Sequence, residues 1–579
     1  MIAANKPIYW ILALSILFTV IIHLNLTKAI FFDNYLNTKQ ISGVNYYLSF
    51  INESSKGNWR LGSPYILEWR DQPYLYPALN INAAGLVKRV LNLDIKSYAL
   101  LMDYSAVFVL MILLITAFLT LFNFHYFGYL AATFYIFFPR IIEWNRTLSP
   151  EINFIPFALF FIFYFWPTSQ SAPRPFGGVG ATNNFWKRET GMAIFTGALF
   201  YIYPYYWTFA LALLAISDLW TFWNQKKIIW KHFYKYLVIA GLASWYIFHL
   251  WQLYQLPYYQ ETMVRIGALS SRWPAGWYTQ AGLLASLVLF FLLKKYVFPR
   301  INLEMAANGA LNKITAGLVA GLIVLNQQLV TGMQLEFNSH YLPTILVFLV
   351  AFWGSLVFIL INNLNSYRKI LIFTSFLLLV GLVFSRIHLI SGGFGINNYI
   401  GGRADEAVNW FLDNQIQDKV VYAPVDLGDE INLWTNNYLV FHGSQELQLM
   451  PTAELIDRFI YFDITNKAIT ENLLDQQVAI FGQTFKSIWQ KTIVLGKLKS
   501  LLTGQLFTAP TLAEYTNYDF GPIYQKRTHP DAAEFNKYLD KYQVDYLVYR
   551  QEDRNSIYKN VPGKIVFESE SYLIKKLPK

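Results

Sequence analysis

The sequence contains no cysteine and carries little charge for its length. Without cysteine there are no disulfides, thiolate metal sites, iron–sulfur clusters or cysteine nucleophiles. Only 14% of the 579 residues are Asp, Glu, Lys or Arg, whereas soluble domains carry about a quarter. The first shortage excludes thiol-based chemistry, and the second argues against an ordinary water-soluble protein.

Several short signatures of catalysis and nucleotide binding are also missing. The sequence has no Gly-x-x-x-x-Gly-Lys loop, no His-Glu-x-x-His, no Gly-x-Ser-x-Gly and no Asp-x-Asp pair. The first three hold phosphates, zinc and an acyl-transfer serine, respectively. Their absence weighs against ATP-driven transport and zinc-protease chemistry.

The sequence contains many long apolar runs. The first, 8–26, has about 19 residues and is long enough to cross a hydrocarbon core of ~30 Å. No small-x-small cleavage site follows it, so we interpret it as an uncleaved span rather than a signal peptide. The remaining runs, with 191–222 divided by the helix-breaking Pro204, lie at 98–121, 127–139, 150–166, 191–203, 205–222, 236–253, 277–294, 314–330, 341–361 and 370–387. The sequence therefore predicts a polytopic α-helical membrane protein of about eleven spans.

The positive charges predict the orientation of these spans. Net charge is +10, and cytoplasmic loops are the segments that collect Lys and Arg. With the N-terminus inside, the short inside segments are rich in these residues, while the short outside loops hold only Arg140, Arg146, Arg265 and Arg272. We therefore expect an N-in, C-out protein of the plasma membrane, with the basic balance explained without nucleic acid.

Domain boundaries follow from this topology. We expect a transmembrane domain over 1–387, with outside loops at 27–97 and 140–150, and a glycine-rich linker at 388–402. An extracytoplasmic α/β domain should occupy 403–579. It is indicated by the helical patterns ADEAVNWFLDN and DAAEFNKYLDKY, the strand patterns DKVVYAP and VDYLVYR, and a closing hairpin in KIVFES…SYLIKKL.

One further segment of the tail, 473–502, places apolar residues along one helical stripe with lysines between them. Such a helix lies either on the membrane surface or against a protein core.

Acids of the first outside loop are candidates for catalysis. Asp33 follows the first span closely, and EWRDQP brings Glu68, Arg70 and Asp71 together. A carboxylate near the interface suits a general base toward a hydroxyl acceptor. The alternatives are a solvated acid at each position and, for EWRDQP, a local ion pair that holds the loop.

Further candidates lie at other predicted outer ends. The second loop carries Glu143, Arg146 and Glu151, where Glu151 follows Pro150 at a helix start and suits the positive end of the helix dipole. Gln328 ends one span, and His340 precedes the next. His340 is suited to phosphate binding or acid/base work near neutral pH, with a structural histidine as the alternative.

Together these features resemble the GT-C superfamily of membrane glycosyltransferases. The local sequences GVNYYLSFINES, PYILEWRDQPYLYPALNINAAGLVKRVL, FYIYPYYWTF, NQQLVTG and YQVDYLVYR are similar to the bacterial branch related to YfhO-type membrane proteins. The resemblance covers nearly the whole chain, through loose patterns of position rather than a fixed signature.

The resemblance implies an inverting transfer of a sugar from a polyprenyl-phosphate donor to a glycan, lipid or protein acceptor at the outer membrane face. The base would be a first-loop acid. The donor phosphate would be neutralised by cations and polar groups from Arg70, Arg146, Arg272, Gln328 and His340, or by a divalent metal ion. No other cofactor is implied.

Two departures from the family pattern matter. Members often carry an acid ahead of the Tyr-containing helix after the first span, where this chain has Gly43 and Asn45. The base is then Asp33 or Asp71, or else the chain is a non-catalytic envelope scaffold or lipid-binding relative. The WWD-type motif of oligosaccharyltransferases is absent, which argues against protein N-glycosylation.

A secondary transporter is a third alternative, disfavoured because the ionisable residues gather outside and paired glycine-interrupted helices are missing.

Overall fold

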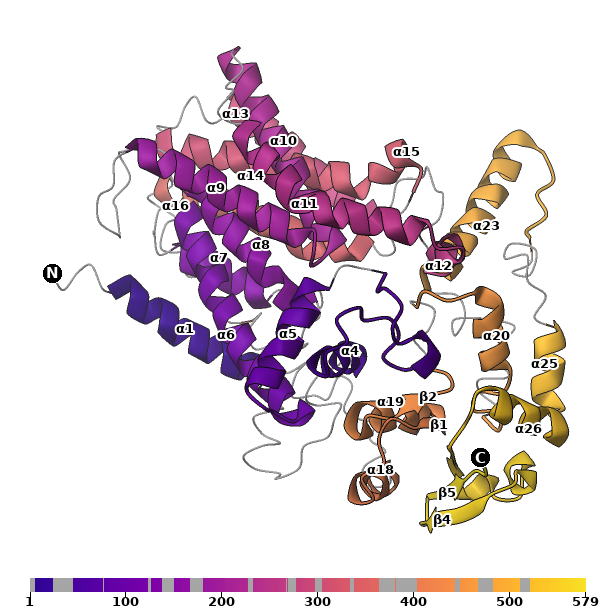
Figure 1. The fold of residues 1–579 in the computed structure, drawn as a ribbon. Coiled ribbons are helices and arrows are strands. Elements are labelled where there is room, and N and C mark those ends of the chain that lie inside the picture. Colours follow the sequence, from indigo (N-terminus) through magenta and orange to yellow (C-terminus); the bar gives the residue numbers. More distant parts are fainter. Residues whose placement is uncertain are drawn as a thin grey trace.

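The computed structural model consists of a large helical bundle and a smaller α/β domain that contains the C-terminus (Figure 1). It describes residues 6–23, 45–75, 78–122, 127–137, 150–166, 181–226, 233–266, 268, 277–296, 305–333, 338–363, 381, 404–442, 448–466, 483–510 and 521–579.

Within the described ranges, ten helices share the core of the bundle. They are α1 (Lys6–Ile22), α6 (Ile95–Leu121), α7 (Phe127–Phe137), α8 (Pro150–Phe165), α9 (Ala181–Leu199), α10 (Pro204–Gln225), α11 (Phe233–Tyr254), α13 (Trp277–Tyr296), α14 (Met305–Leu325) and α16 (Leu342–Asn363). The break predicted at Pro204 is confirmed, because this proline opens α10 at a position where its missing N–H costs nothing.

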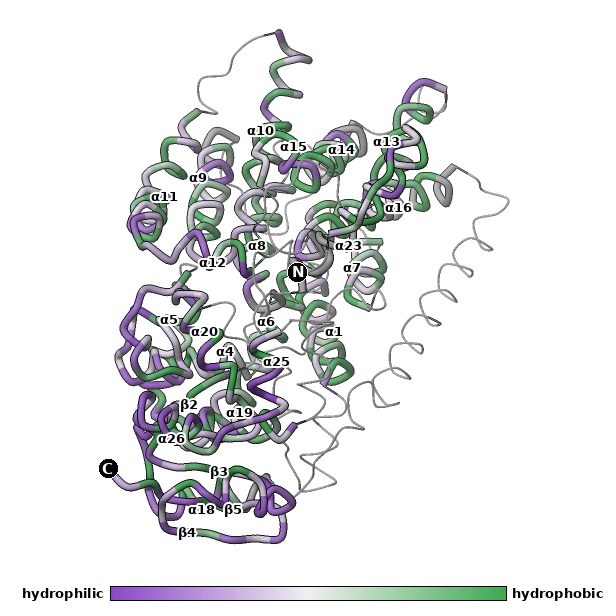
Figure 2. Tube along the Cα trace, turned by 90° about the vertical axis from the view of Figure 1, so that its right-hand side faces the viewer, coloured by the Kyte–Doolittle hydropathy of each residue, from purple (hydrophilic) through white to green (hydrophobic). Residues whose placement is uncertain are grey.

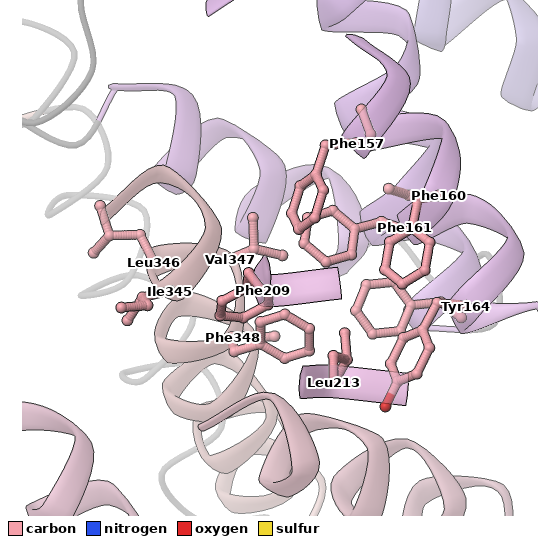
Figure 3. Packing of buried hydrophobic residues seen from close by; sticks show 14 of the residues in the cluster. Phe157, Phe160, Phe161, Tyr164, Phe209, Leu213, Ile345, Leu346, Val347 and Phe348 are labelled. Carbon is pink, nitrogen blue, oxygen red and sulfur yellow. The ribbon is translucent and has the colours of Figure 1, made fainter. Parts of the chain in front are cut away.

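Aromatic rings fill the middle of the bundle. Phe157, Phe161 and Phe348 stack edge to face between α8 and α16, and Phe209 of α10 closes the group (Figure 3). Edge-to-face pairs of this kind are favourable beyond the area that they bury. Many aromatic residues of the bundle helices therefore serve to pack its core.

Three of the described helices are long and apolar enough to cross a membrane, namely Ser97–Leu121, Phe233–Tyr254 and Tyr278–Tyr296. Shorter apolar helices lie beside them at Pro7–Ile22, Phe127–Phe137, Asn153–Phe165, Ala310–Leu325 and Leu342–Val357. Large apolar side chains of α11 and α13 are exposed, such as Trp245 at 65% and Val288 at 57%. An exposed apolar surface of this extent indicates contact with lipid or another apolar partner. Figure 2 shows the apolar bundle apart from the more polar C-terminal part.

The smaller domain is built on a five-stranded sheet with the order β2-β1-β3-β5-β4. The strands are β1 (Val420–Tyr422), β2 (Tyr438–Leu439), β3 (Tyr546–Arg550), β4 (Lys564–Glu568) and β5 (Tyr572–Lys576). β1 runs parallel to β2 and β3, whereas β5 is antiparallel to β3 and β4. The strands at β1 and β3 and the closing hairpin agree with the sequence patterns.

Helices cover both faces of this sheet and form two apolar clusters. The helices of this part are α18 (Ala404–Asp413), α19 (Val425–Thr435), α20 (Thr452–Ile460), α23 (Gln483–Thr503), α25 (Gly521–Thr528) and α26 (Ala532–Lys541). α18 and α26 confirm the two helical patterns, and α26 begins at Asp531, whose carboxylate accepts from the N–H groups of Ala533 and Glu534.

The first loop contacts both the bundle and the C-terminal domain. It forms α4 (Asn45–Ser55), the 3₁₀ turn η2 (Leu67–Trp69) and α5 (Leu79–Val90). Tyr65 and Ile66 are buried in the same cluster as Leu439 and Phe459 of the C-terminal domain. In Figure 1 α4 lies between the bundle and α19. The first loop therefore joins the two parts of the molecule.

Candidate functional site

Among the described acids of the first loop, Glu53 is the most enclosed. It lies on α4 and is 4% exposed. Lys56 Nζ donates to its Oε1 and Arg70 Nε to its Oε2, each at 2.8 Å. Burial raises the pKa of Tyr438, and the negative charge of Glu53 raises it further. The phenol therefore stays protonated and donates to Glu53 Oε1 at 3.4 Å.

Glu68 pairs with the C-terminal domain. Its carboxylate lies 3.3 Å from Arg458 Nη2, and the guanidinium of Arg458 also contacts Glu454 at 2.9 Å. Trp69 donates its indole N–H to the same Glu454 at 2.7 Å. The sequence offered a local ion pair within EWRDQP as an alternative, but the ion pairs of this segment are made with residues outside it, Glu68 with Arg458 and Arg70 with Glu53.

Further bonds fix this contact between the first loop and the C-terminal domain, which we name the loop–tail joint (residues 45–75 with 429–442 and 448–458). The Leu439 N–H donates to the Tyr65 carbonyl at 2.6 Å, and the Tyr65 ring stacks on His442 at a centroid distance of 3.6 Å. Asn52 Nδ2 donates to Asn436 Oδ1 at 2.5 Å. Asp71, by contrast, is exposed and forms no hydrogen bond or ion pair with the described part of the chain.

His340 lies in a second group of polar and aromatic side chains, at the end of the bundle that meets α5. Its ring is stacked on Tyr205 with centroids 4.8 Å apart, and Tyr203 is 5.6 Å away. Tyr341 meets Tyr205 edge to face and exchanges a hydrogen bond of 3.0 Å with Thr208. We name these five residues the histidine cluster.

The local backbone explains why the cluster forms. Tyr203 is extended immediately before Pro204, so the chain reverses between α9 and α10 and leaves its tyrosines at the bundle end. His340 belongs to the 3₁₀ turn η5 (Asn338–Tyr341), which directly precedes α16. Two turns of the chain, about 135 residues apart, are thereby brought together.

α5 connects the first loop to this end of the bundle. Asn80 Nδ2 donates to Asn153 Oδ1 of α8 at 2.6 Å, and the Leu79 N–H donates to the Tyr201 carbonyl at 3.1 Å. Asn153 is 3% exposed. This pairing links α5, α8 and the turn before α10.

Of the other predicted site residues, some lie within the described part of the chain and some lie outside it. Gln328 is fully buried at the start of α15 (Gln327–Thr331) and donates to the Leu325 carbonyl at 2.9 Å. Glu151 lies in the first turn of α8, and its side chain is outside the described part. Also outside the described residues lie Asp33, Glu143, Arg146 and Arg272. Within the described residues, no group of three His, Asp or Glu side chains is placed to hold a metal ion.

The sequence missed several residues of these arrangements. Arg458, Asn80 and Asn153 had no distinguishing local pattern, because each has its partner in a distant segment. The tyrosines before and after Pro204 did carry a signal, since they surround a helix break at a predicted membrane boundary.

No family model and no curated protein matches this chain.

Proposed function

We propose that this chain is an integral membrane glycosyltransferase of the plasma membrane. It transfers a sugar from a polyprenyl-phosphate donor to an acceptor hydroxyl at the outer face, in the assembly of envelope or surface glycans. The GT-C resemblance of the sequence supplies the reaction class.

The histidine cluster carries this proposal. An imidazole at a bundle end donates a hydrogen bond to a phosphate oxygen, and it is the side chain that changes charge near neutral pH. Of the adjacent tyrosines, Tyr203 is half-buried and offers part of its ring to a sugar or an isoprenoid chain, whereas Tyr205 and Tyr341 are buried in the core. A bound donor would thus have its phosphate at His340 and its apolar tail along the exposed apolar surface of the bundle.

The chemistry assigns a role to each reactant. The acceptor oxygen attacks the anomeric carbon while the bond from that carbon to the phosphate oxygen breaks, and the polyprenyl phosphate leaves with both bonding electrons. A first-loop carboxylate takes the hydroxyl proton. We assign this base to Asp33 or to Asp71, because Glu68 is held in the ion pair with Arg458.

A donor panel tests this proposal. The purified full chain, in lipid nanodiscs, is incubated with polyprenyl-phosphate sugars and an acceptor mixture, and released polyprenyl phosphate is quantified. We expect release with one donor, a loss of about 10²-fold or more in whichever of Asp33→Asn and Asp71→Asn removes the base, and a clear loss in His340→Gln. His529→Gln, an exposed histidine of the C-terminal domain, is the matched control and should keep full activity.

A non-catalytic scaffold is the second candidate, and the loop–tail joint favours it. Glu53 and Glu68 act there as structural ion-pair partners rather than as free carboxylates. If no donor releases polyprenyl phosphate although the protein is folded, the transferase proposal is wrong and the scaffold takes its place.

A further inference from the structure

A cavity lies at the end of the bundle away from the histidine cluster. Its walls come from α8, α9, α10, α11 and α14, and its volume is about 260 Å³. Asp218 on its wall lies 13 residues beyond Tyr205 along α10, or about 20 Å at 1.5 Å per residue. The cavity is therefore separate from the histidine cluster. We name it the lysine pocket, and its lining includes Tyr164, Arg188, Ser217, Asp218, Trp220, Thr221, Asn224, Lys235, Asn312 and Lys313.

Charged side chains in this pocket are unequal in number. Arg188, Lys235 and Lys313 are cations, and they meet two carboxylates, Asp218 and the fully buried Glu189. With all five groups ionised, the charges of these described residues sum to +1. Ionisable groups within apolar helices are costly, so a cluster of them in a bundle of this kind marks a functional site.

Both carboxylates are already engaged. Glu189 contacts Arg188 through Oε1 at 2.5 Å and Lys235 through Oε2 at 3.1 Å. Asp218 accepts from Lys235 at 2.9 Å and from the Tyr236 hydroxyl at 2.7 Å. Neither of them forms an ion pair with Lys313.

Lys313 is the cation without an acid. Among the described residues, the only hydrogen bond of its ammonium group is a long one, 3.4 Å, to the Trp166 carbonyl, and no carboxylate lies within ion-pair distance. An ammonium has three donors, so two of its N–H bonds are available to a ligand in the pocket. A partly enclosed cation of this kind is strongly stabilised when an anion reaches it.

The mouth of the pocket indicates how an anion would reach it. Asn224 is exposed at the C-terminal end of α10, and Lys294 lies 5.4 Å from the Trp220 ring. Neighbouring apolar side chains on α10 are exposed, with Leu219 at 61% and Trp223 at 71%. An anionic group surrounded by basic and then apolar surface matches the headgroup and chains of a lipid.

We propose that the lysine pocket binds an anionic phosphate group, with Lys313 as its main electrostatic contact and Arg188 as a second. The amides of Asn224 and Asn312 and the hydroxyls of Ser217 and Thr221 supply further hydrogen bonds. This site is independent of the proposed transferase reaction, because it lies at the other end of the bundle and shares no residue with the histidine cluster.

Binding to the purified full chain in neutral detergent tests the proposal. The probes are dioctanoyl phosphatidic acid, dioctanoyl phosphatidylcholine and inorganic phosphate, each followed by titration calorimetry. We expect phosphatidic acid to bind, and Lys313→Met to weaken it about tenfold or more because a charge-assisted hydrogen bond is lost. Lys295→Met removes the same charge from the same bundle end but outside the pocket, and should bind like the parent.

A second variant guards against a folding defect in Lys313→Met. Asn224→Trp narrows the mouth of the pocket without touching its ion pairs and should also weaken binding. Inorganic phosphate that binds with the same dependence on Lys313 would support the site and identify a soluble phosphoester as its ligand. The proposal is overturned if no probe binds, if phosphatidylcholine binds as tightly as phosphatidic acid, or if Lys313→Met and Asn224→Trp both bind like the parent.

Discussion

At the scale of single residues, the first loop illustrates how a buried charge decides the local structure. Glu53 would be costly to enclose alone, because an ionised carboxylate loses its hydration. Two cations and one phenol surround it, and each belongs to a different place in the chain: Lys56 just after α4, Arg70 at the end of η2 and Tyr438 in the strand β2. The acid therefore holds three segments in one arrangement.

Removing one partner should loosen this arrangement. Arg70→Met leaves Glu53 Oε2 without its donor, and we expect a loss of about 1–3 kcal/mol in the local free energy of opening. Hydrogen exchange of the amides in 45–55 measures this loss as faster exchange. Arg60→Met, which removes an exposed arginine that forms no ion pair with a described residue, should leave exchange unchanged. Equal exchange in the two variants would contradict a structural role for the Glu53 ion pair.

At the scale of the elements, a glycine determines how closely α14 packs against α16. A Cβ atom at Gly317 of α14 would overlap the ring of Phe348 on α16. The missing side chain lets the ring lie directly against the helix backbone, in the aromatic core shown in Figure 3. Small residues serve helix pairs in membranes in this way.

We expect Gly317→Ala to lower the thermal unfolding temperature of the detergent-solubilised protein. The overlap forces the ring or the helix to move, at a cost of about 1–3 kcal/mol. Gly282→Ala on α13 is the matched control, because nothing lies within 4 Å of its added Cβ. A double variant with Phe348→Leu should recover much of the loss. If Gly317→Ala and Gly282→Ala unfold alike, the contact does not limit packing.

Helix α23 differs from the bundle helices in what it buries. Its second half exposes Val494, Leu498, Leu501 and Leu502, next to the exposed Lys497. These side chains are not part of the apolar clusters of the C-terminal domain. Of the two alternatives for this segment, packing on a protein core does not extend to this half of the helix.

The elements were predicted well where the signal is local. Pro204 marks a helix start, and the short apolar run in VDYLVYR marks β3, because both follow from residues that are neighbours in sequence. The loop–tail joint could not be predicted. Glu68 and Arg458 are each ordinary surface residues by pattern, and only their meeting across the fold makes them a pair. The two-residue strand β2 is likewise too short to leave a periodic signal.

The same reasoning applies to the candidate site. Gln328 and His340 were singled out as polar residues at predicted membrane boundaries, and His340 does lie among tyrosines. The cation excess of the lysine pocket was not anticipated, since Lys313 and Arg188 appeared as ordinary positive charges of an inside loop. Their enclosure depends on how five helices pack around them.

At the scale of the whole molecule, the absence of cysteine makes the orientation easy to measure. Single cysteines can be introduced without any background. Lys537→Cys on the exposed face of α26 and Asn224→Cys at the mouth of the lysine pocket mark the two ends of the molecule.

In intact cells we expect a membrane-impermeant maleimide to label Lys537→Cys and to leave Asn224→Cys unlabelled until the membrane is permeabilised. The reason is that the segments at the lysine-pocket end are rich in Lys and Arg, and the positive-inside rule assigns such segments to the cytoplasm. The cysteine-free parent is the control. Labelling of both variants in intact cells, or the reverse order, would overturn the N-in, C-out topology.

The loop–tail joint also sets an order of events during synthesis. Trp69 and its partner Glu454 are 385 residues apart. At a ribosomal rate of about 5–20 residues per second, the first loop waits roughly 20–80 s before the domain that encloses Tyr65 and Ile66 has been made. During that interval its apolar side chains depend on a chaperone, the translocation machinery or the membrane for cover. The C-terminal domain thus covers a segment that left the ribosome 385 residues earlier.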